Sequence, residues 1–289
     1  MAITMEMIKD GLGELGLSEG DSVLLHSSLR ELGPARELVK LPNCGADLVI
    51  DAFLETVGPD GLLALPTLTA TFSPNTPDGP VQYAYDPDET PSRVGSITNI
   101  FLERPERKRS MHPTHSLAAI GARAEEYVAD HETEKGSTFH RNSPYGKNFD
   151  WDAYICFFGT DNRTNTTLHV VEDWMDLPYM ATTKAMVKGP DGEPMEVEVT
   201  KSPKGYRDFY KQDSRAARVL EESGIMTWTK IGRADVGLMT CRDCMQLFWD
   251  KMLEDPCLLM GNEGESEFCD RWAEPTIEHV KSGAVGELA

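Results

Sequence analysis

His169 has the setting most typical of a catalytic side chain in this sequence. Residues 153–173, AYICFFGTDNRTNTTLHVVED, predict a buried strand, a glycine break, a polar loop and a helix from about Thr167. Such a unit puts polar side chains at the carboxyl end of a sheet, where α/β proteins usually bind ligands. Glu172 and Asp173 follow by three and four residues, so either carboxylate could orient the imidazole as a general base. The same spacing also fits an amphipathic core helix with one charged face.

Hydroxyl side chains follow two other expected strands. Residues 21–26 (DSVLLH) are typical of a strand that ends at Ser27 and Ser28. Residues 62–65 are typical of a strand that runs into Thr67. Both are further strand-end sites at which a ligand could be bound.

A long proline-rich loop is expected at residues 71–92. Loops of this length are usually functional or disordered. The loop could form a wall for an amine-bearing ligand, and the alternative is a solvated surface excursion. Its aromatic and acidic side chains are Asp78, Tyr83, Tyr85, Asp86, Asp88 and Glu89.

A cluster of cations follows this loop and contrasts with an otherwise acidic chain. Arg104, Arg107, Lys108 and Arg109 lie within six residues. Arginine offers phosphate two parallel hydrogen bonds, so the cluster could contact a nucleotide-like cofactor. A solvated basic face is the alternative.

Two histidines and four cysteines raise the question of a metal. His112 and His115 bracket a proline, but a zinc site of this kind needs two further ligands, and none is well placed. The cysteines form no second close pair, and two of them lie on an expected helix; they are Cys241, Cys244, Cys257 and Cys269. We therefore expect hydrogen bonding by the histidines, core or surface positions for the cysteines, and no metal.

The elements that must position these residues alternate between strand and helix patterns, which predicts an α/β fold. Residues 182–200 predict a β-hairpin, interpreted as an insertion that covers the site. Residues 229–237 are expected to form a polar loop, and residues 264–289, acidic and glycine-rich, a frayed tail. Further helices are expected at residues 5–16, 97–103, 206–223 and 239–253.

Composition excludes several classes of protein. The 289 residues include 48 acidic and 28 basic ones, a formal net charge of −20, which repels nucleic acid and anionic membranes and permits a cationic partner. Adaptation to salt would give the same excess. No segment approaches the ~20 apolar residues of a membrane span, and the acidic start does not fit a signal peptide, so a cytoplasmic protein with reduced thiols is expected. The motifs of nicotinamide, P-loop and serine-hydrolase sites are missing from the sequence.

Three stretches of the chain together carry a family resemblance. They are LLHSSLRELG at residues 24–33, MHPTHSLAAIG at 111–121, and SPYGKN followed by NTTLHVVED between 143 and 173. LPTLT at 65–69, DPDETPSRVG at 86–95 and KIGRADVGLM at 230–239 match as well. In this order and spacing they resemble the aminoglycoside 3-N-acetyltransferases, also called antibiotic N-acetyltransferases, over nearly the whole chain.

The resemblance implies a single α/β domain, residues 1–289, with a family-specific fold of a mixed sheet flanked by helices. It implies metal-free transfer of acetyl from acetyl-coenzyme A to an amine, most typically the 3-amino group of a 2-deoxystreptamine aminoglycoside. His169 corresponds to the family's base and Glu172 to the glutamate that follows it. The coenzyme cleft would be lined by His26, Ser27, Ser28, Thr67, Thr114, His115 and Ser116.

The charged segments extend this picture of two substrates. We expect Arg109 to lie near the phosphates of the coenzyme, because it belongs to the concentrated basic cluster. We expect carboxylates to surround a cationic acceptor, because several opposing charges are needed to bind it in a cleft. The residues expected there are Tyr85, Asp86, Asp88, Glu89 and Asp173.

Two other functions are compatible with the sequence. One is acylation of a different amine, for example in secondary metabolism. The other is a non-catalytic module that binds coenzyme A or a small cation, in which His169 is a core histidine. The sequence does not specify an oligomeric state.

Overall fold

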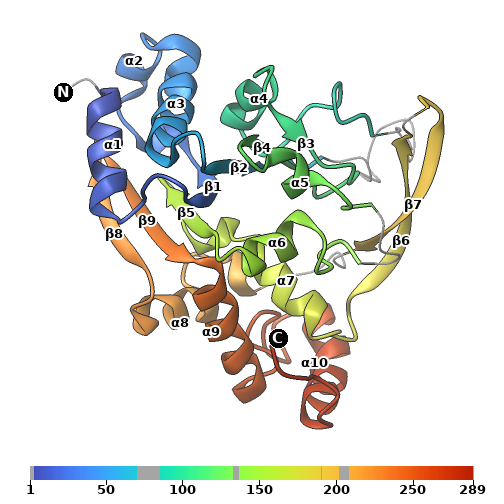
Figure 1. Ribbon diagram of the computed structural model, residues 1–289. Coiled ribbons are helices and arrows are strands. Elements are labelled where there is room, and N and C mark those ends of the chain that lie inside the picture. The colour runs from blue at the N-terminus through green and yellow to red at the C-terminus, as the bar shows by residue number, and fades with distance from the viewer. Residues whose placement is uncertain (1–2, 70–84, 133–136, 190, 202–207, 289) are drawn as a thin grey trace.

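A mixed sheet of seven strands organises the molecule. The computed structural model describes residues 3–69, 85–132, 137–189, 191–201 and 208–288. In this part of the chain the strand order is β3-β4-β2-β1-β5-β9-β8 (Figure 1). β1 runs parallel to both β2 and β5, and the outer pairs are antiparallel. The strands are β1 (Ser22–Ser27), β2 (Leu62–Pro66), β3 (Lys108–Arg109), β4 (Leu117–Gly121), β5 (Tyr154–Phe158), β8 (Thr227–Ile231) and β9 (Ala234–Thr240).

The sheet buries a core on each face, because side chains alternate along its strands. On β5, Cys156 and Phe158 join one core, and Ile155 and Phe157 join the other. The first core is completed by α1 (Met5–Glu14), α2 (Ala35–Leu38), α3 (Ala46–Val57) and α4 (Ser96–Leu102). The second is completed by α5 (Ala124–Val128), α6 (Pro144–Asp150), α7 (Thr167–Trp174), α8 (Arg215–Ser223), α9 (Cys241–Glu254) and α10 (Glu267–Lys281). The result is the expected α/β architecture, with helices on both faces of the sheet (Figure 1).

The expected hairpin is confirmed as a separate two-stranded sheet. β6 (Ala181–Lys188) and β7 (Pro194–Lys201) pair in antiparallel register at the flank of the molecule, on the right in Figure 1. The hairpin has a small core of its own, in which Val187 forms a backbone bridge to Tyr85. Thr200 also exchanges hydrogen bonds with Thr138. These contacts fix the hairpin to the body of the protein.

The sequence interpretation was wrong in two segments near the carboxyl terminus. Residues 229–237, expected as a polar loop, belong to the hairpin of β8 and β9, with a turn at Gly232 (φ 63°). β8 looks polar because it is an edge strand with mostly exposed side chains. Residues 267–281, expected to fray, form α10, which buries Ala273 and Val280.

One expected helix is interrupted. The described part of residues 206–223 forms a short 3₁₀ turn, η4 (Asp208–Tyr210), and then α8. Ser214 separates them because its hydroxyl accepts a hydrogen bond from Ala217 N at 2.9 Å and caps α8. This break places Tyr210 on a turn rather than on a helix.

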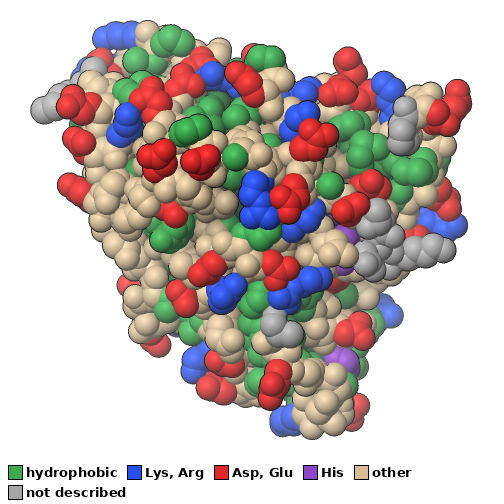
Figure 2. Space-filling model, viewed as in Figure 1, with side chains coloured by type: hydrophobic (Ala, Val, Ile, Leu, Met, Phe, Trp, Pro, Cys, Tyr) green, Lys and Arg blue, Asp and Glu red, His purple; other side chains and the backbone are tan. Residues whose placement is uncertain are grey.

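The surface agrees with the acidic composition. In Figure 2, acidic and basic side chains are interspersed over the face shown, with no separate basic patch. All six cysteines are free thiols, and five of them are buried. Among the residues described, no helix combines the length and apolar character needed to cross a membrane.

Candidate active site

The turn after β5 brings the central helix α7 to the end of the sheet. Gly159 adopts a positive φ of 65°, and a Cβ atom there would lie 2.7 Å from the carbonyl oxygen of Ser28. The next residues form a 3₁₀ turn, η3 (Asn162–Thr164). Asn165 Oδ1 then accepts a hydrogen bond from Thr167 N at 3.1 Å, which starts α7. Asn165 therefore provides the polar side chain at the start of the helix, whereas the side chain of Thr166 makes no capping bond.

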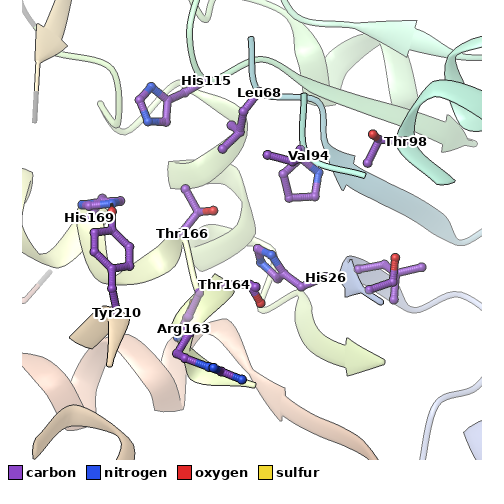
Figure 3. A pocket seen from close by; sticks show the side chains of 14 residues that line it. His26, Leu68, Val94, Thr98, His115, Arg163, Thr164, Thr166, His169 and Tyr210 are labelled. Atoms are coloured by element: carbon purple, nitrogen blue, oxygen red, sulfur yellow. Dashed lines mark hydrogen bonds between the residues drawn. The ribbon is translucent and has the colours of Figure 1, made fainter. Parts of the chain in front are cut away.

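A cavity of about 300 Å³ opens where β1, β2 and β5 end. Figure 3 shows His169 and Tyr210 side by side at one end, with His26 and Thr98 toward the other. Among the described residues that line it, the one with a full charge at neutral pH is Arg163, which is paired with Asp161 at 2.7 Å. The lining consists of Leu25, His26, Ser27, Pro66, Leu68, Val94, Thr98, His115, Arg163, Thr164, Asn165, Thr166, His169 and Tyr210.

His169 is held by hydrogen bonds on both ring nitrogens. Its Nδ1 lies 2.7 Å from Glu172 Oε2, and its Nε2 lies 2.6 Å from the hydroxyl of Tyr210. The other oxygen of Glu172 accepts a hydrogen bond from the Tyr179 hydroxyl at 2.7 Å. Glu172 is completely buried, so it supports the imidazole from behind the cavity wall. Of the two carboxylates considered from the sequence, Glu172 is the one that orients His169.

His26 is the second imidazole in the cavity wall. It is the last residue but one of β1, is 5% exposed, and has no hydrogen-bond partner for Nε2. Burial lowers the pKa of His26 to about 3, so the ring is neutral at physiological pH. A buried polar atom without a partner costs about 1–3 kcal/mol, which a bound ligand with a complementary group would relieve.

The residues expected around the coenzyme lie at different depths relative to the cavity. His26, Ser27 and His115 line the cavity, and the Thr114 hydroxyl supports the His115 ring through a 2.8 Å contact with Nδ1. Ser28 lies just beyond, and its N–H donates to Phe158 O. The remaining residues, Thr67 and Ser116, are fully buried and hydrogen-bonded to each other at 3.0 Å.

Arg109, expected near the phosphates of the coenzyme, is not among the residues that line the cavity. It is 8% exposed, and its Nε donates to Thr67 Oγ1 at 3.1 Å and to Ser116 Oγ at 3.2 Å. Further hydrogen bonds go to the carbonyl oxygens of Thr67, Pro87 and Thr90. Because its donors are used within the chain, the guanidinium ties β2 and β4 to the segment after Tyr85. The other cations of the cluster are also paired, Arg104 with Asp47 and Asp51, Arg107 with Asp88, and Lys108 with Glu125.

The residues expected around the acceptor do not line the cavity. Tyr85 is fully buried, donates to Ser110 O at 2.8 Å, and has its pKa raised to about 12 mainly by burial. Asp86 pairs with Lys188 of the hairpin at 2.7 Å, Asp88 pairs with Arg107, and Glu89 is exposed. Asp173 accepts hydrogen bonds from Ser137 at 2.7 Å and Thr200 at 3.1 Å. Asp78 and Tyr83 lie outside the described residues, and no described hairpin residue lines the cavity, so the expected cover by the hairpin is not observed there.

The histidine pair forms hydrogen bonds at a turn, as expected. His112 Nδ1 accepts from the backbone N–H of His115 at 3.0 Å, and the His112 ring stacks on His131 at 4.4 Å. Within the described ranges no group of three or more histidine, cysteine or acidic side chains is arranged to hold a metal ion.

Sequence reasoning missed two tyrosines that contact the His169–Glu172 pair. Tyr210 was assigned to a helix, and nothing in the local pattern places its hydroxyl on His169. Tyr179 follows Glu172 by seven residues but lies beyond the end of α7, so helical spacing does not connect them. Both contacts depend on tertiary packing.

Comparison with known proteins extends the likeness over most of the chain. Residues 24–253 match the family model for aminoglycoside 3-N-acetyltransferase. The chain is 28% identical over 254 residues to the SPbeta prophage-derived aminoglycoside N(3')-acetyltransferase-like protein YokD of Bacillus subtilis (strain 168), covering 83% of this chain and 86% of the relative. It is 25% identical over 246 residues to aminoglycoside N(3)-acetyltransferase IV of Salmonella sp., covering 85% and 86%.

A solved structure agrees with this likeness. The apoenzyme of aminoglycoside acetyltransferase AAC(3)-IVa superposes with a TM-score of 0.75 at 25% identity, over 95% of this chain and 98% of that one. The family model alone spans well over half of the sequence, including β5 and the His169–Glu172 pair. The chain therefore belongs to the aminoglycoside 3-N-acetyltransferase family, whose members are acyltransferases.

Proposed function

We propose that the protein transfers the acetyl group of acetyl-coenzyme A to an amine of an aminoglycoside, at the 3-amino group of its 2-deoxystreptamine ring, with His169 as general base. The observation that carries this proposal is the 2.7 Å contact between His169 Nδ1 and buried Glu172, in a cavity at the ends of three strands. We also propose that residues 1–289 act as one acetyltransferase domain.

The chemistry follows from the tautomer that this contact favours. A carboxylate accepts hydrogen bonds, so Nδ1 of His169 carries the proton and Nε2 carries the lone pair. An amine must lose a proton as it attacks the thioester carbonyl, and Nε2 takes up that proton. Glu172 stabilises the imidazolium that forms, and the proton is then available to the departing thiolate.

The cavity suits the thioester end of the coenzyme. Apolar side chains such as Leu25, Leu68 and Val94 fit the neutral pantetheine arm, and the unpartnered Nε2 of His26 offers it a hydrogen bond. Relatives with this fold have been solved with CoASH and with gentamicin, sisomicin and apramycin, which supports the choice of both substrates.

Thiol release tests the proposal. The purified protein is incubated with acetyl-coenzyme A and, separately, gentamicin, sisomicin, apramycin, a simple aliphatic amine or no amine. We expect release of thiol with the aminoglycosides, and nuclear magnetic resonance of the product to place the acetyl group on the 3-amino nitrogen. Release with the aliphatic amine alone would indicate a different acceptor. Binding of coenzyme A without release for any amine would indicate a non-catalytic module.

A further inference from the structure

Tyr210 is the exposed end of a chain of four hydrogen-bonded side chains. Tyr179 donates to Glu172, Glu172 contacts His169 Nδ1, and His169 Nε2 contacts the Tyr210 hydroxyl, with distances of 2.7, 2.7 and 2.6 Å. Tyr179, Glu172 and His169 are 1%, 0% and 5% exposed, whereas Tyr210 is 48% exposed. Tyr210 also lines the cavity (Figure 3). It is therefore the member of this chain that a substrate meets first.

The direction of the last hydrogen bond follows from the others. Glu172 accepts from Tyr179 and, as a carboxylate, also from His169 Nδ1–H. His169 Nε2 then has no proton and accepts one hydrogen bond, so the Tyr210 hydroxyl is the donor. The single nitrogen with which His169 can take up a proton is already occupied by Tyr210.

Tyr210 is held in this position by its own segment. Its neighbour Phe209 is 1% exposed and packs edge-on against His169, with ring centroids 5.2 Å apart. Asp208, at the start of η4, accepts a hydrogen bond from Arg215 N at 2.8 Å and so connects the turn to the start of α8. Because Phe209 and Asp208 hold this segment in place, the Tyr210 hydroxyl is positioned before any substrate binds.

We propose that Tyr210 is a catalytic residue that relays the proton of the acceptor amine to His169. This rests on the proposed acetyl transfer. As the amine nitrogen bonds to the thioester carbon, its proton passes to Tyr210 Oη while the proton of Tyr210 passes to His169 Nε2. The carbonyl electrons move to oxygen and then return as the C–S bond breaks. The imidazolium proton goes back through Tyr210 to the departing thiolate, so amide and free thiol form and Tyr210 remains neutral throughout.

A relay fits the geometry better than direct contact between the amine and His169. Direct contact would require the substrate to break a 2.6 Å hydrogen bond and to reach a ring that is almost completely buried. The relay uses that bond as it stands, and needs only that the amine approach the exposed hydroxyl. Proton transfer along an existing hydrogen bond requires no movement of Phe209 or η4.

The test compares Tyr210→Phe with wild type in single-turnover acetylation of an aminoglycoside that the wild type accepts. The variant keeps the ring and removes the hydroxyl, so we expect the single-turnover rate to fall by at least about tenfold, as for loss of a proton-transfer group. Both KM values, measured separately in the steady state, are expected to stay nearly unchanged. Tyr154→Phe is the matched control, because Tyr154 is a partly exposed tyrosine on β5 that does not line the cavity. Its rate is expected to equal that of wild type.

Rates in mixtures of H₂O and D₂O provide a readout that a structural role would not change. A relay moves two protons in one step, so the wild-type rate is expected to depend on the deuterium fraction along a curve, and the Tyr210→Phe rate along a straight line. The relay would be overturned by any of three results. These are a wild-type rate that depends linearly on the deuterium fraction, a Tyr210→Phe rate equal to that of wild type, or a slower Tyr210→Phe rate that still follows a curve. If wild type acetylates none of the amines, the proposed function fails, whereas an active wild type with any of these results refutes the relay alone.

Discussion

Replacing Glu172 with glutamine tests how His169, the proposed general base, is held. The carboxylate is completely buried, and its hydrogen bonds include those from Tyr179 and from His169, each of 2.7 Å. Glutamine has the same shape but one acceptor oxygen. The Tyr179 hydroxyl can rotate and accept from the new amide group, so His169 keeps its orientation and its Nδ1 proton. The variant therefore removes the negative charge while keeping the contacts with Tyr179 and His169.

The size of the effect follows from that single loss. A hydrogen bond to a charged group contributes about 1.5–3 kcal/mol, and one between neutral groups about 0.5–1.5 kcal/mol. A difference of about 1–2 kcal/mol in stabilising the imidazolium corresponds to a rate about 5- to 30-fold lower. The KM for acetyl-coenzyme A is expected to stay constant, because Glu172 does not line the cavity.

The assay is single-turnover thiol release, with a melting temperature measured on the same preparation. Asp176→Asn is the control, since Asp176 is an exposed carboxylate just beyond α7 and its loss should leave the rate unchanged. Glu172→Ala should be slower and less stable than Glu172→Gln, because it leaves the Tyr179 hydroxyl and His169 Nδ1 buried without this partner. A Glu172→Gln protein with a wild-type rate and a clearly lower melting temperature would refute the reasoning, because it would make the pair a core contact.

Three further predictions use the same protein. His169→Ala is expected to stay folded and bind coenzyme A while its rate falls by about 10²- to 10⁴-fold; a stable, fully active variant in the thiol assay would exclude the general base. Arg109→Ala is expected to lower the free energy of unfolding in urea by about 2–4 kcal/mol, because buried carbonyl and hydroxyl oxygens lose their donor, and to leave coenzyme affinity per folded molecule unchanged in calorimetric titration. Stability is expected to fall on acidification, because the pKa of His26 is about 3 in the folded protein and about 6.5 when unfolded, so protons bind preferentially to the unfolded chain below pH 6.5. Between about pH 7.5 and 5.5, His26 alone is expected to lower the free energy of unfolding, measured in urea, by about 1.4 kcal/mol. Burial also lowers the pKa of His112 and His131, so these residues act in the same direction. In a His26→Gln protein the free energy of unfolding should fall by correspondingly less over this pH range.

The elements closest to the site were predictable from sequence because their signals are local. β5 is a short apolar run ended by Gly159, and α7 begins after a polar loop at the position its pattern indicated. The spacing of His169 and Glu172 on one helix is itself a contact, since residues three apart share a helix face. That pair therefore needs no knowledge of the fold.

The remaining contacts depend on the fold, and the sequence patterns do not reveal them. Arg109 belongs to a basic cluster that could contact phosphates, but the pairing of β4 with both β3 and β2 places its guanidinium beside Thr67 and Ser116, where it is buried. Tyr210 carries no periodic signal, because it lies on a 3₁₀ turn whose position is set by Asp208 and α8. Charge and spacing identify which residues could react, and packing decides which of them reach the cavity.

The parallel pairing of β1 with β5 also constrains how the molecule can be made. Val23 pairs with Tyr154 and Ser27 with Phe158, so the whole first half of the chain must be synthesised before β1 receives this neighbour. Closing so long a loop costs chain entropy, and proteins dominated by such distant pairings fold slowly. Until then β1, with the apolar sequence SVLLHS, has an open edge that can pair with other chains. Protection of this edge by a chaperone during translation would therefore raise the yield of folded enzyme, and the cavity would be completed only after Tyr210, which follows β5 and α7 in the chain, had emerged from the ribosome.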